Sequence, residues 1–309
     1  MKKIYLLAMA FIVTGTFIAC QQEKIISSHD NTEVTFSSNI VKTTPTTKVV
    51  GSTWEENDII GVYMLEEGLN VVVAGVGNIP YDTPIGGETG SFTASDQVIY
   101  FPDNGDKVRF MAYYPYRETI TSYIYPVNVS DQRVQKNIDL LYSINETPLD
   151  KTTPDKKVPL VFDHQLTKII VHVKAGEGLD NVDLAKIKIY FTGLNTTADF
   201  TLMDGTLSNP GGIANITPVS INPKATYAAS FEAIVLPAEE VTGAQILFDL
   251  DNGDTEQEIE SDLFSWHFTQ KLLKGTKYTY NAIINRSGIV IETSINDWIS
   301  KEEENIEAE

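Results

Sequence analysis

The chain has 309 residues, with 42 acidic and 23 basic side chains and a formal net charge of −19. Because it has no excess of Lys and Arg to neutralise phosphates, this composition argues against nucleic-acid binding. The length suggests two domains of ordinary size, which can bury hydrophobic cores without disulfides.

Residues 1–19 are predicted to be a lipoprotein signal peptide. Two lysines follow the initiator methionine, an apolar run extends from Ile4 to Val13, and Ala19 stands before Cys20. A basic start, a short apolar core and a small residue before the cleavage point are typical of export signals. Phe17 departs from the leucine usual three residues before the lipidated cysteine.

Cys20 is the only cysteine of the chain, so it has no partner for an internal disulfide. We expect acylation of Cys20 and a flexible lipid-anchored segment at residues 20–32. An ordinary cleaved signal with an incidental cysteine is the alternative. A membrane-spanning helix is disfavoured, because the apolar run is interrupted at residues 14–16 and falls short of the ~20 residues needed.

From residue 33 onward the pattern favours strands. Val34, Phe36 and Ile40 alternate with polar residues, residues 187–191 are β-branched or aromatic, and residues 278–284 place apolar side chains on one face of a two-residue repeat. Turn signals at 103–106, 204–205 and 252–253 predict hairpins. The only helical candidate, residues 130–137, is too short to organise a domain. Antiparallel β-sandwiches are therefore expected.

A polar segment with two prolines at residues 147–157 precedes an apolar strand. We place a domain boundary there, which predicts an N-terminal β-sandwich at 33–156 and a C-terminal one at 157–300, followed by an acidic tail at 301–309. A long loop inside one domain is the alternative, although unstructured loops of this length are uncommon.

Several segments, in order along the chain, resemble the Mfa-like fimbrillin family. The segments that carry the resemblance are 54–64, 113–116, 138–142, 160–169, 200–206, 277–280 and 295–298. The resemblance implies an exported lipoprotein subunit of a pilus, or fimbrium, built of two transthyretin-like β-sandwich domains in tandem. It also implies a cell-surface location at the outer membrane and a role in adhesion.

In this family, the resemblance further implies, a trypsin-like protease removes the first strand of stalk subunits and a strand of the next subunit takes its place. Here the displaced strand would be residues 33–41, with Val34, Phe36 and Ile40 facing the core. The following loop offers Lys48 as a cleavage site, where many relatives carry arginine. A solvated loop charge is the alternative for Lys48.

At the other end, Ile289, Ile291 and Ile295 occupy alternate positions of a donor strand or of the last strand of their own domain. The tail at 301–309 is too acidic to enter an apolar groove. We favour the last strand, which suits a tip, anchor or accessory subunit somewhat better than a stalk subunit.

Features of an enzyme or of a metal or cofactor site are missing from the sequence. The four histidines have no metal-binding spacing, and a single cysteine cannot form a thiolate zinc site. Neither a nucleophile elbow nor a phosphate loop is found. Residues 249–254 resemble a calcium loop, but the glycine is out of register, so a hairpin turn is preferred.

Tyr116, Tyr123 and Tyr125 form an aromatic cluster that could stack on sugars or on a partner protein. The competing interpretation is that these rings fill the core. A surface lipoprotein that binds glycans outside any pilus is therefore the alternative function. The main expectation is a non-enzymatic fimbrial subunit that binds other subunits through strand exchange, the outer membrane through the lipid on Cys20, and surface ligands of host or bacterial cells.

Overall fold

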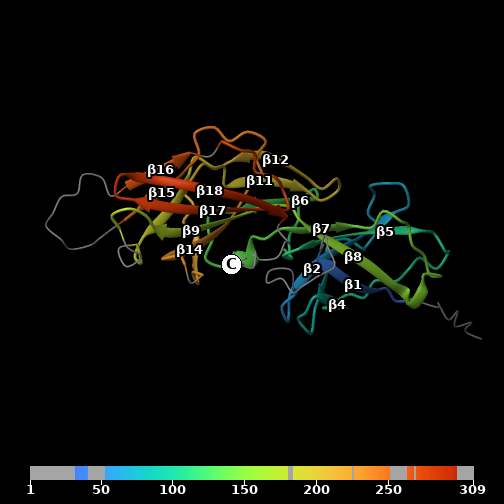
Figure 1. Ribbon diagram of the computed structural model, residues 1–309. Coiled ribbons are helices and arrows are strands. Elements are labelled where there is room, and N and C mark those ends of the chain that lie inside the picture. Colours follow the sequence, from blue (N-terminus) through green and yellow to red (C-terminus); the bar gives the residue numbers. More distant parts are fainter. Residues whose placement is uncertain are drawn as a thin grey trace, which may run out of the picture. The chain divides into compact units, whose positions relative to one another are not determined.

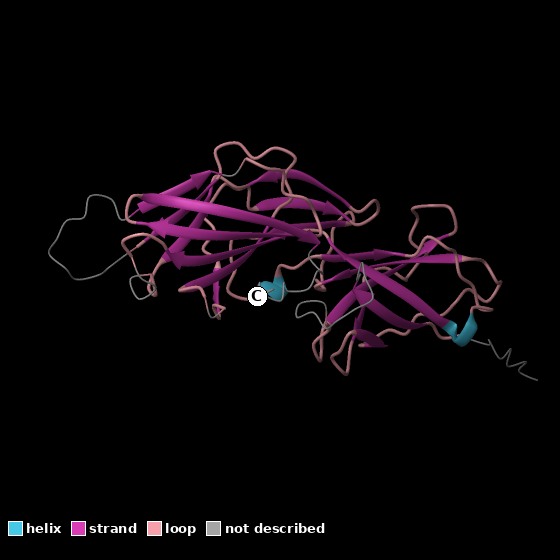
Figure 2. Ribbon diagram, viewed as in Figure 1, coloured by secondary structure: helices cyan, strands magenta, loops and turns pink. Residues whose placement is uncertain are grey.

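The computed structural model describes residues 32–40, 53–179, 184–224, 226–250, 263–267 and 269–297. Almost all regular structure in these residues is β-strand, as Figure 2 shows. The all-β prediction is confirmed. No helix among the described residues is long and apolar enough to cross a membrane.

The strands run in chain order as labelled in Figure 1. They are β1 (Thr35–Ile40), β2 (Ile59–Glu66), β3 (Ile79–Asp82), β4 (Thr89–Ala94), β5 (Val108–Tyr114), β6 (Ile124–Asn128), β7 (Leu141–Ile144), β8 (Lys157–His164), β9 (Thr167–Ala175), β10 (Lys188–Thr192), β11 (Thr197–Thr201), β12 (Thr206–Gly211), β13 (Val219–Ile221), β14 (Ala229–Val235), β15 (Gln245–Asp249), β16 (Leu263–His267), β17 (Thr276–Asn285) and β18 (Gly288–Asp297). Two 3-10 turns, Gln135–Asn137 and Pro154–Lys156, complete the described elements.

Seven strands form a closed barrel in the order β1-β4-β3-β2-β5-β7-β8. The first strand, β1, completes the ring, because it pairs antiparallel with β4 on one side and parallel with β8 on the other. The prediction of a purely antiparallel sandwich was wrong for this group. A two-residue period fixes which side chains point inward but not which strands become neighbours.

The remaining strands form three sheets, ordered β13-β14-β9-β17-β18, β10-β15-β16 and β12-β11-β6. The central pair β9 and β17 is parallel. Apolar side chains of all three sheets share one core, which includes Tyr278, Tyr280, Ala282 and Ile284 on one face of β17. That face agrees with the sequence-based prediction.

Two strands depart from the boundary expected at residue 156. β8 follows it but pairs with β1 and β7 in the barrel. β6 precedes it but pairs with β11. The hydrogen-bonded sheets therefore do not divide at a single point of the sequence.

Local predictions fared unevenly. The turn at Asp204 and Gly205 connects the paired strands β11 and β12, as predicted. The segment 98–101 is not a regular strand, so the predicted hairpin at 103–106 is wrong. The helical candidate at 130–137 contains only the short 3-10 turn Gln135–Asn137. The turn at 252–253 lies outside the described residues.

Candidate functional site

The site that bears most directly on function is the position of β1 in the barrel. Val34, Phe36, Ser38 and Ile40 point inward and are buried, whereas Thr35 and Asn39 are exposed. This alternation follows from the two-residue period of a strand.

Both edges of β1 are hydrogen-bonded. Residues 35–40 pair with residues 157–162 of β8, and residues 36–39 pair with residues 89–92 of β4. Just before β1, the Val34 amide donates to the Ile99 carbonyl at 2.9 Å, and the Phe101 amide donates to the Thr32 carbonyl at 2.9 Å. Without β1, the facing backbone groups of β4 and β8 would lack these partners.

Phe36 has the largest inward side chain of β1. Its ring packs edge-on against Tyr81 at 4.9 Å and Phe110 at 5.3 Å between centroids. The Tyr81 hydroxyl accepts a hydrogen bond from the Ile99 amide at 2.9 Å, and burial raises the pKa of Tyr81 to about 12. The aromatic contact thus joins β1 to β3 and β5 inside the barrel.

Trp54 packs in the barrel core near the C-terminal end of β1. Its ring makes edge-on contacts with Phe92 of β4, Phe162 of β8 and Tyr114 of β5, at 5.1, 5.2 and 5.5 Å. The Tyr114 hydroxyl donates to Asp58 Oδ1 at 3.0 Å, and burial raises the pKa of Asp58. Edge-on aromatic pairs of this kind add stabilisation beyond area burial alone.

A small polar space lies between Ser38 and Trp54, opposite Gly90 of β4. Gly90 is the cross-strand partner of Ser38. A Cβ on Gly90 would stand 2.9 Å from both Ser38 Oγ and Trp54 Cδ1, and 2.7 Å from the Phe92 ring. Within the described part of the chain, neither Ser38 Oγ nor Trp54 Nε1 has a hydrogen-bond partner, although the residues are only 2% and 3% exposed.

Sequence reasoning overlooked this arrangement. The signal was a serine at an inward position of an otherwise apolar alternation, together with a glycine inside the strand that pairs with it. A glycine inside a strand often marks a close approach of neighbouring atoms. Cys20 and Lys48, the expected lipidation and cleavage positions, lie outside the described residues.

Ile289, Ile291 and Ile295 lie on β18, which pairs with β17 along its whole length. Ile289 and Ile291 pack partly against the core, whereas Ile295 is 56% exposed. β18 is at one end of its sheet order, so β17 is its only partner there. In the intact chain these residues thus occupy the last strand of their own sheet.

The three tyrosines of the expected adhesive cluster have different environments. Tyr123 is 39% exposed and Tyr116 is half-buried, but Tyr125 is only 2% exposed. The Tyr125 ring packs edge-on against Tyr113 at 5.5 Å and lies under the Arg117 guanidinium at 4.6 Å. Tyr125 is therefore a core residue, and its assignment as an adhesive side chain was wrong.

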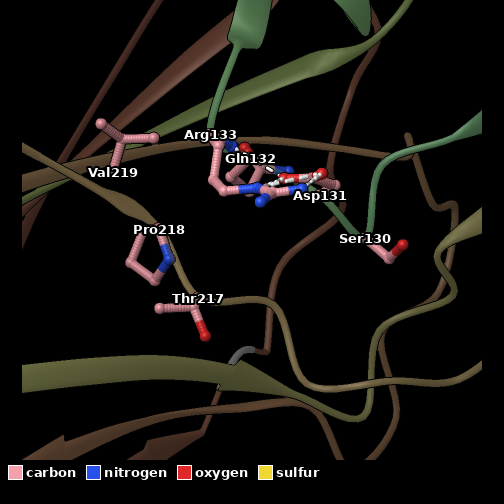
Figure 3. Close-up of a pocket in the computed structure, with 7 residues that line it drawn as sticks. All are labelled: Ser130, Asp131, Gln132, Arg133, Thr217, Pro218 and Val219. Atoms are coloured by element: carbon pink, nitrogen blue, oxygen red, sulfur yellow. Dashed lines mark hydrogen bonds and ion pairs between the residues drawn. The ribbon is translucent and has the colours of Figure 1, made fainter.

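An open pocket of about 530 Å³ lies beside the segment that follows β6. Figure 3 shows its lining by residues 130–133 and 217–219. Arg133 and Asp131 form an exposed ion pair at 2.6 Å, and the hydrogen bonds from Arg133 lower the pKa of Asp131 to about 2. The two charges satisfy one another, so the pocket offers little fixed charge to a ligand.

Buried Gln132 connects this segment to β14. Its amide donates to the carbonyls of Val129 at 2.6 Å and Ile234 at 2.7 Å, while its Oε1 accepts from the Ile234 amide at 2.9 Å. Gln132 therefore pairs with Ile234 much as a strand residue would. This role is structural.

The buried histidines also have local partners. His164 Nδ1 lies 2.8 Å from Asp139 Oδ1, and His172 Nδ1 lies 2.7 Å from Ser230 Oγ. In the residues that the structure describes, no group of three or more His, Cys, Asp or Glu side chains is arranged to hold a metal ion.

Comparison with known proteins gives a consistent result. A family model described as "Fimbrillin-like" matches residues 47–298. The chain is 34% identical over 262 residues to "Putative fimbrium subunit Fim1C" of Bacteroides uniformis, covering 82% of this chain and 81% of that protein.

Solved structures are also similar. A crystal structure described as "a putative cell adhesion protein" from Bacteroides uniformis has a TM-score of 0.71 and 31% identity, over 88% of this chain and 99% of that chain. Another such protein, from Bacteroides ovatus, has a TM-score of 0.66 and 21% identity over the same shares of the two chains, which shows similarity of fold. The chain belongs to the fimbrillin-like family and is a fimbrial subunit.

Proposed function

We propose that this subunit joins its neighbours by β-strand exchange at the position of β1. The observation that carries the proposal is that β1 is bonded on both edges and buried on its inner face, yet is separated from the rest of the barrel by residues 41–52. The family match, which begins at residue 47, lies wholly beyond β1.

The energetics favour replacement of β1 over its simple loss. Removing β1 would expose the backbone groups of β4 and β8 and the apolar positions now filled by Val34, Phe36 and Ile40. An incoming strand satisfies the backbone and fills the apolar space at once. Subunits joined in this way should be held together strongly.

Export as a lipoprotein is the second part of the proposal. Acylation of Cys20 would anchor the chain at the outer membrane, and cleavage after Lys48 would then release the strand and the lipid together. The proposal assigns no catalytic step to the chain. The division into two domains is retained, with β6 and β8 contributing to sheets across the boundary in the sequence.

The position of the chain in the fimbrium follows from which strands are exchanged. A subunit that keeps β18 paired with β17 accepts a neighbour's strand but donates none. This arrangement suits the tip, anchor or accessory role preferred from the sequence. A subunit that also donates β18 can repeat along a stalk.

Substitution at the cleavage site tests the proposal. Lys48→Ala should keep the chain at full length and abolish assembly into high-mass polymer, as measured by denaturing gels of surface extracts. Lys42→Ala, in the same loop, and Lys48→Arg should both assemble normally. Polymer made of full-length Lys48→Ala chains would refute exchange at this position.

A further inference from the structure

The barrel places unequal demands on the four inward side chains of β1. Val34, Phe36 and Ile40 fill apolar space, and Phe36 meets two aromatic rings. Ser38, in contrast, faces Gly90 and the edge of Trp54, where even a Cβ on Gly90 would stand within 3 Å of both. The inward order is therefore apolar, apolar, small, apolar.

The same order recurs at the other end of the chain. Ile289, Ile291, Thr293 and Ile295 occupy alternate positions of β18. Read in the same chain direction, they correspond to Val34, Phe36, Ser38 and Ile40, with Thr293 at the small position.

We propose that Ser38, Gly90 and Trp54 define a size-selective position that sets the register and direction of the strand inserted between β4 and β8, and that residues 289–295 of a second copy fit it in one way. The inference rests on the proposed strand exchange. In that fit the inserted strand runs parallel to β8 and Thr293 replaces Ser38. A chain that donates β18 repeats, which favours a stalk role over the tip, anchor or accessory role.

Other registers fail for identifiable reasons. A shift of two residues places Ile291 or Ile295 against Gly90 and Trp54, where the space is already filled. A shift of one residue turns Glu292 into the barrel, where a carboxylate would be buried without a partner. Reversal of direction with Thr293 kept in place brings Asp297 to the buried position of Val34.

β18 is also well placed to leave its own sheet. It is a terminal strand of the sheet with β17 as its partner there, and both Thr293 and Ile295 are exposed in the intact chain. β1, by contrast, is paired on both edges. Exchange therefore replaces a doubly paired strand with one that was paired on a single edge and gains a second.

Disulfide trapping in fimbriae from the producing cell tests the register. The fit places Ser294 opposite Thr89 and Glu292 opposite Ser91, by analogy with the present pairs Asn39–Thr89 and Ser37–Ser91. Directly opposite residues of antiparallel strands are close enough for a disulfide. Donor chains with Ser294→Cys or Glu292→Cys are therefore co-expressed with acceptor chains carrying Thr89→Cys or Ser91→Cys.

The two matched combinations should give cross-linked dimers on non-reducing gels. The swapped combinations, Ser294→Cys with Ser91→Cys and Glu292→Cys with Thr89→Cys, serve as controls and should not, since their cysteines lie two residues apart along the strands. Preferential cross-linking of the swapped pairs would overturn the register. Parent chains that form no polymer at all would instead refute strand exchange itself.

A second variant tests size selection without relying on cross-links. Thr293 is exposed in the intact chain, so Thr293→Leu should leave the melting temperature of the monomer unchanged. It should reduce polymer yield by about tenfold or more, because a larger side chain overfills the position. Thr293→Ser should assemble like the parent. Full assembly of Thr293→Leu would overturn size selection.

Discussion

The ring of Phe36 stands edge-on against the ring of Tyr81, with 4.9 Å between centroids and an angle of 83° between planes. This contact links β1 to β3 across the barrel core. Phe36→Ala should therefore lower the free energy of unfolding by about 3–5 kcal/mol, the range for loss of a buried phenylalanine. Urea unfolding of the intact chain measures the change.

Ser37→Ala is the matched control for Phe36→Ala, because Ser37 is the next residue of β1 and is only half-buried. It should change stability by less than about 0.5 kcal/mol. Equal effects of the two substitutions would show that β1 does not contribute to the barrel core as described.

Gly90→Ala should destabilise the barrel even though it adds one methyl group. The new Cβ would approach Ser38 Oγ, Trp54 Cδ1 and the Phe92 ring to within 3 Å. Overpacking of this kind costs about 1–3 kcal/mol. Gly211→Ala in β12 is the control, since its Cβ would meet nothing nearer than 3.6 Å. Thermal unfolding midpoints compare the two, and an unchanged midpoint for Gly90→Ala would contradict the tight packing at Ser38.

Gln132→Ala should be costly despite its place in an irregular segment. The substitution leaves the amide and carbonyl of Ile234 without their partners. Two unsatisfied buried backbone groups cost about 2–4 kcal/mol. Arg133→Ala, one residue further on, removes an exposed ion pair and should cost less than about 0.5 kcal/mol. Chemical denaturation of both variants checks the difference, which would vanish if the segment were not bound to β14.

Alkaline pH should weaken the barrel through Tyr81. Burial raises its pKa from 10.0 to about 12, so its stabilising effect is complete below pH 10 and is lost as the pH rises through about 12. At pH 9, Tyr81→Phe should be about 1 kcal/mol less stable than the parent, because it lacks the hydrogen bond to Ile99. This difference should shrink above pH 10. A constant difference from pH 9 to 12 would contradict the shifted pKa.

The alternation of residues predicted the inward face of β1 and of β17 because a strand's side-chain period is fixed by backbone geometry. Alternation could not predict that β1 lies between β4 and β8. That pairing joins residues about 120 positions apart, such as Thr35 and Lys157, and depends on how the whole barrel closes.

The tyrosine cluster shows another limit of sequence patterns. Tyr123 and Tyr125 are two residues apart and would share a face within one strand. Ser122 and Tyr123, however, have positive φ angles of 52° and 60° in the turn that precedes β6. The turn ends the two-residue repeat, so Tyr123 stays partly exposed while Tyr125 enters the core.

The slot at Ser38 depends on three residues that no single motif connects. Ser38 and Gly90 meet through strand pairing, and Trp54 reaches them from the segment before β2. A serine among alternating apolar residues is too common to be recognised by itself. Only the packing around it reveals that size is restricted there.

The most direct test of strand exchange is the N-terminus and intact mass of the subunit recovered from assembled fimbriae on the producing cell. The account predicts a chain that begins at Val49, with β1 and the lipid at Cys20 both removed. Assembled chains that still begin at an acylated Cys20 and retain β1 would contradict it.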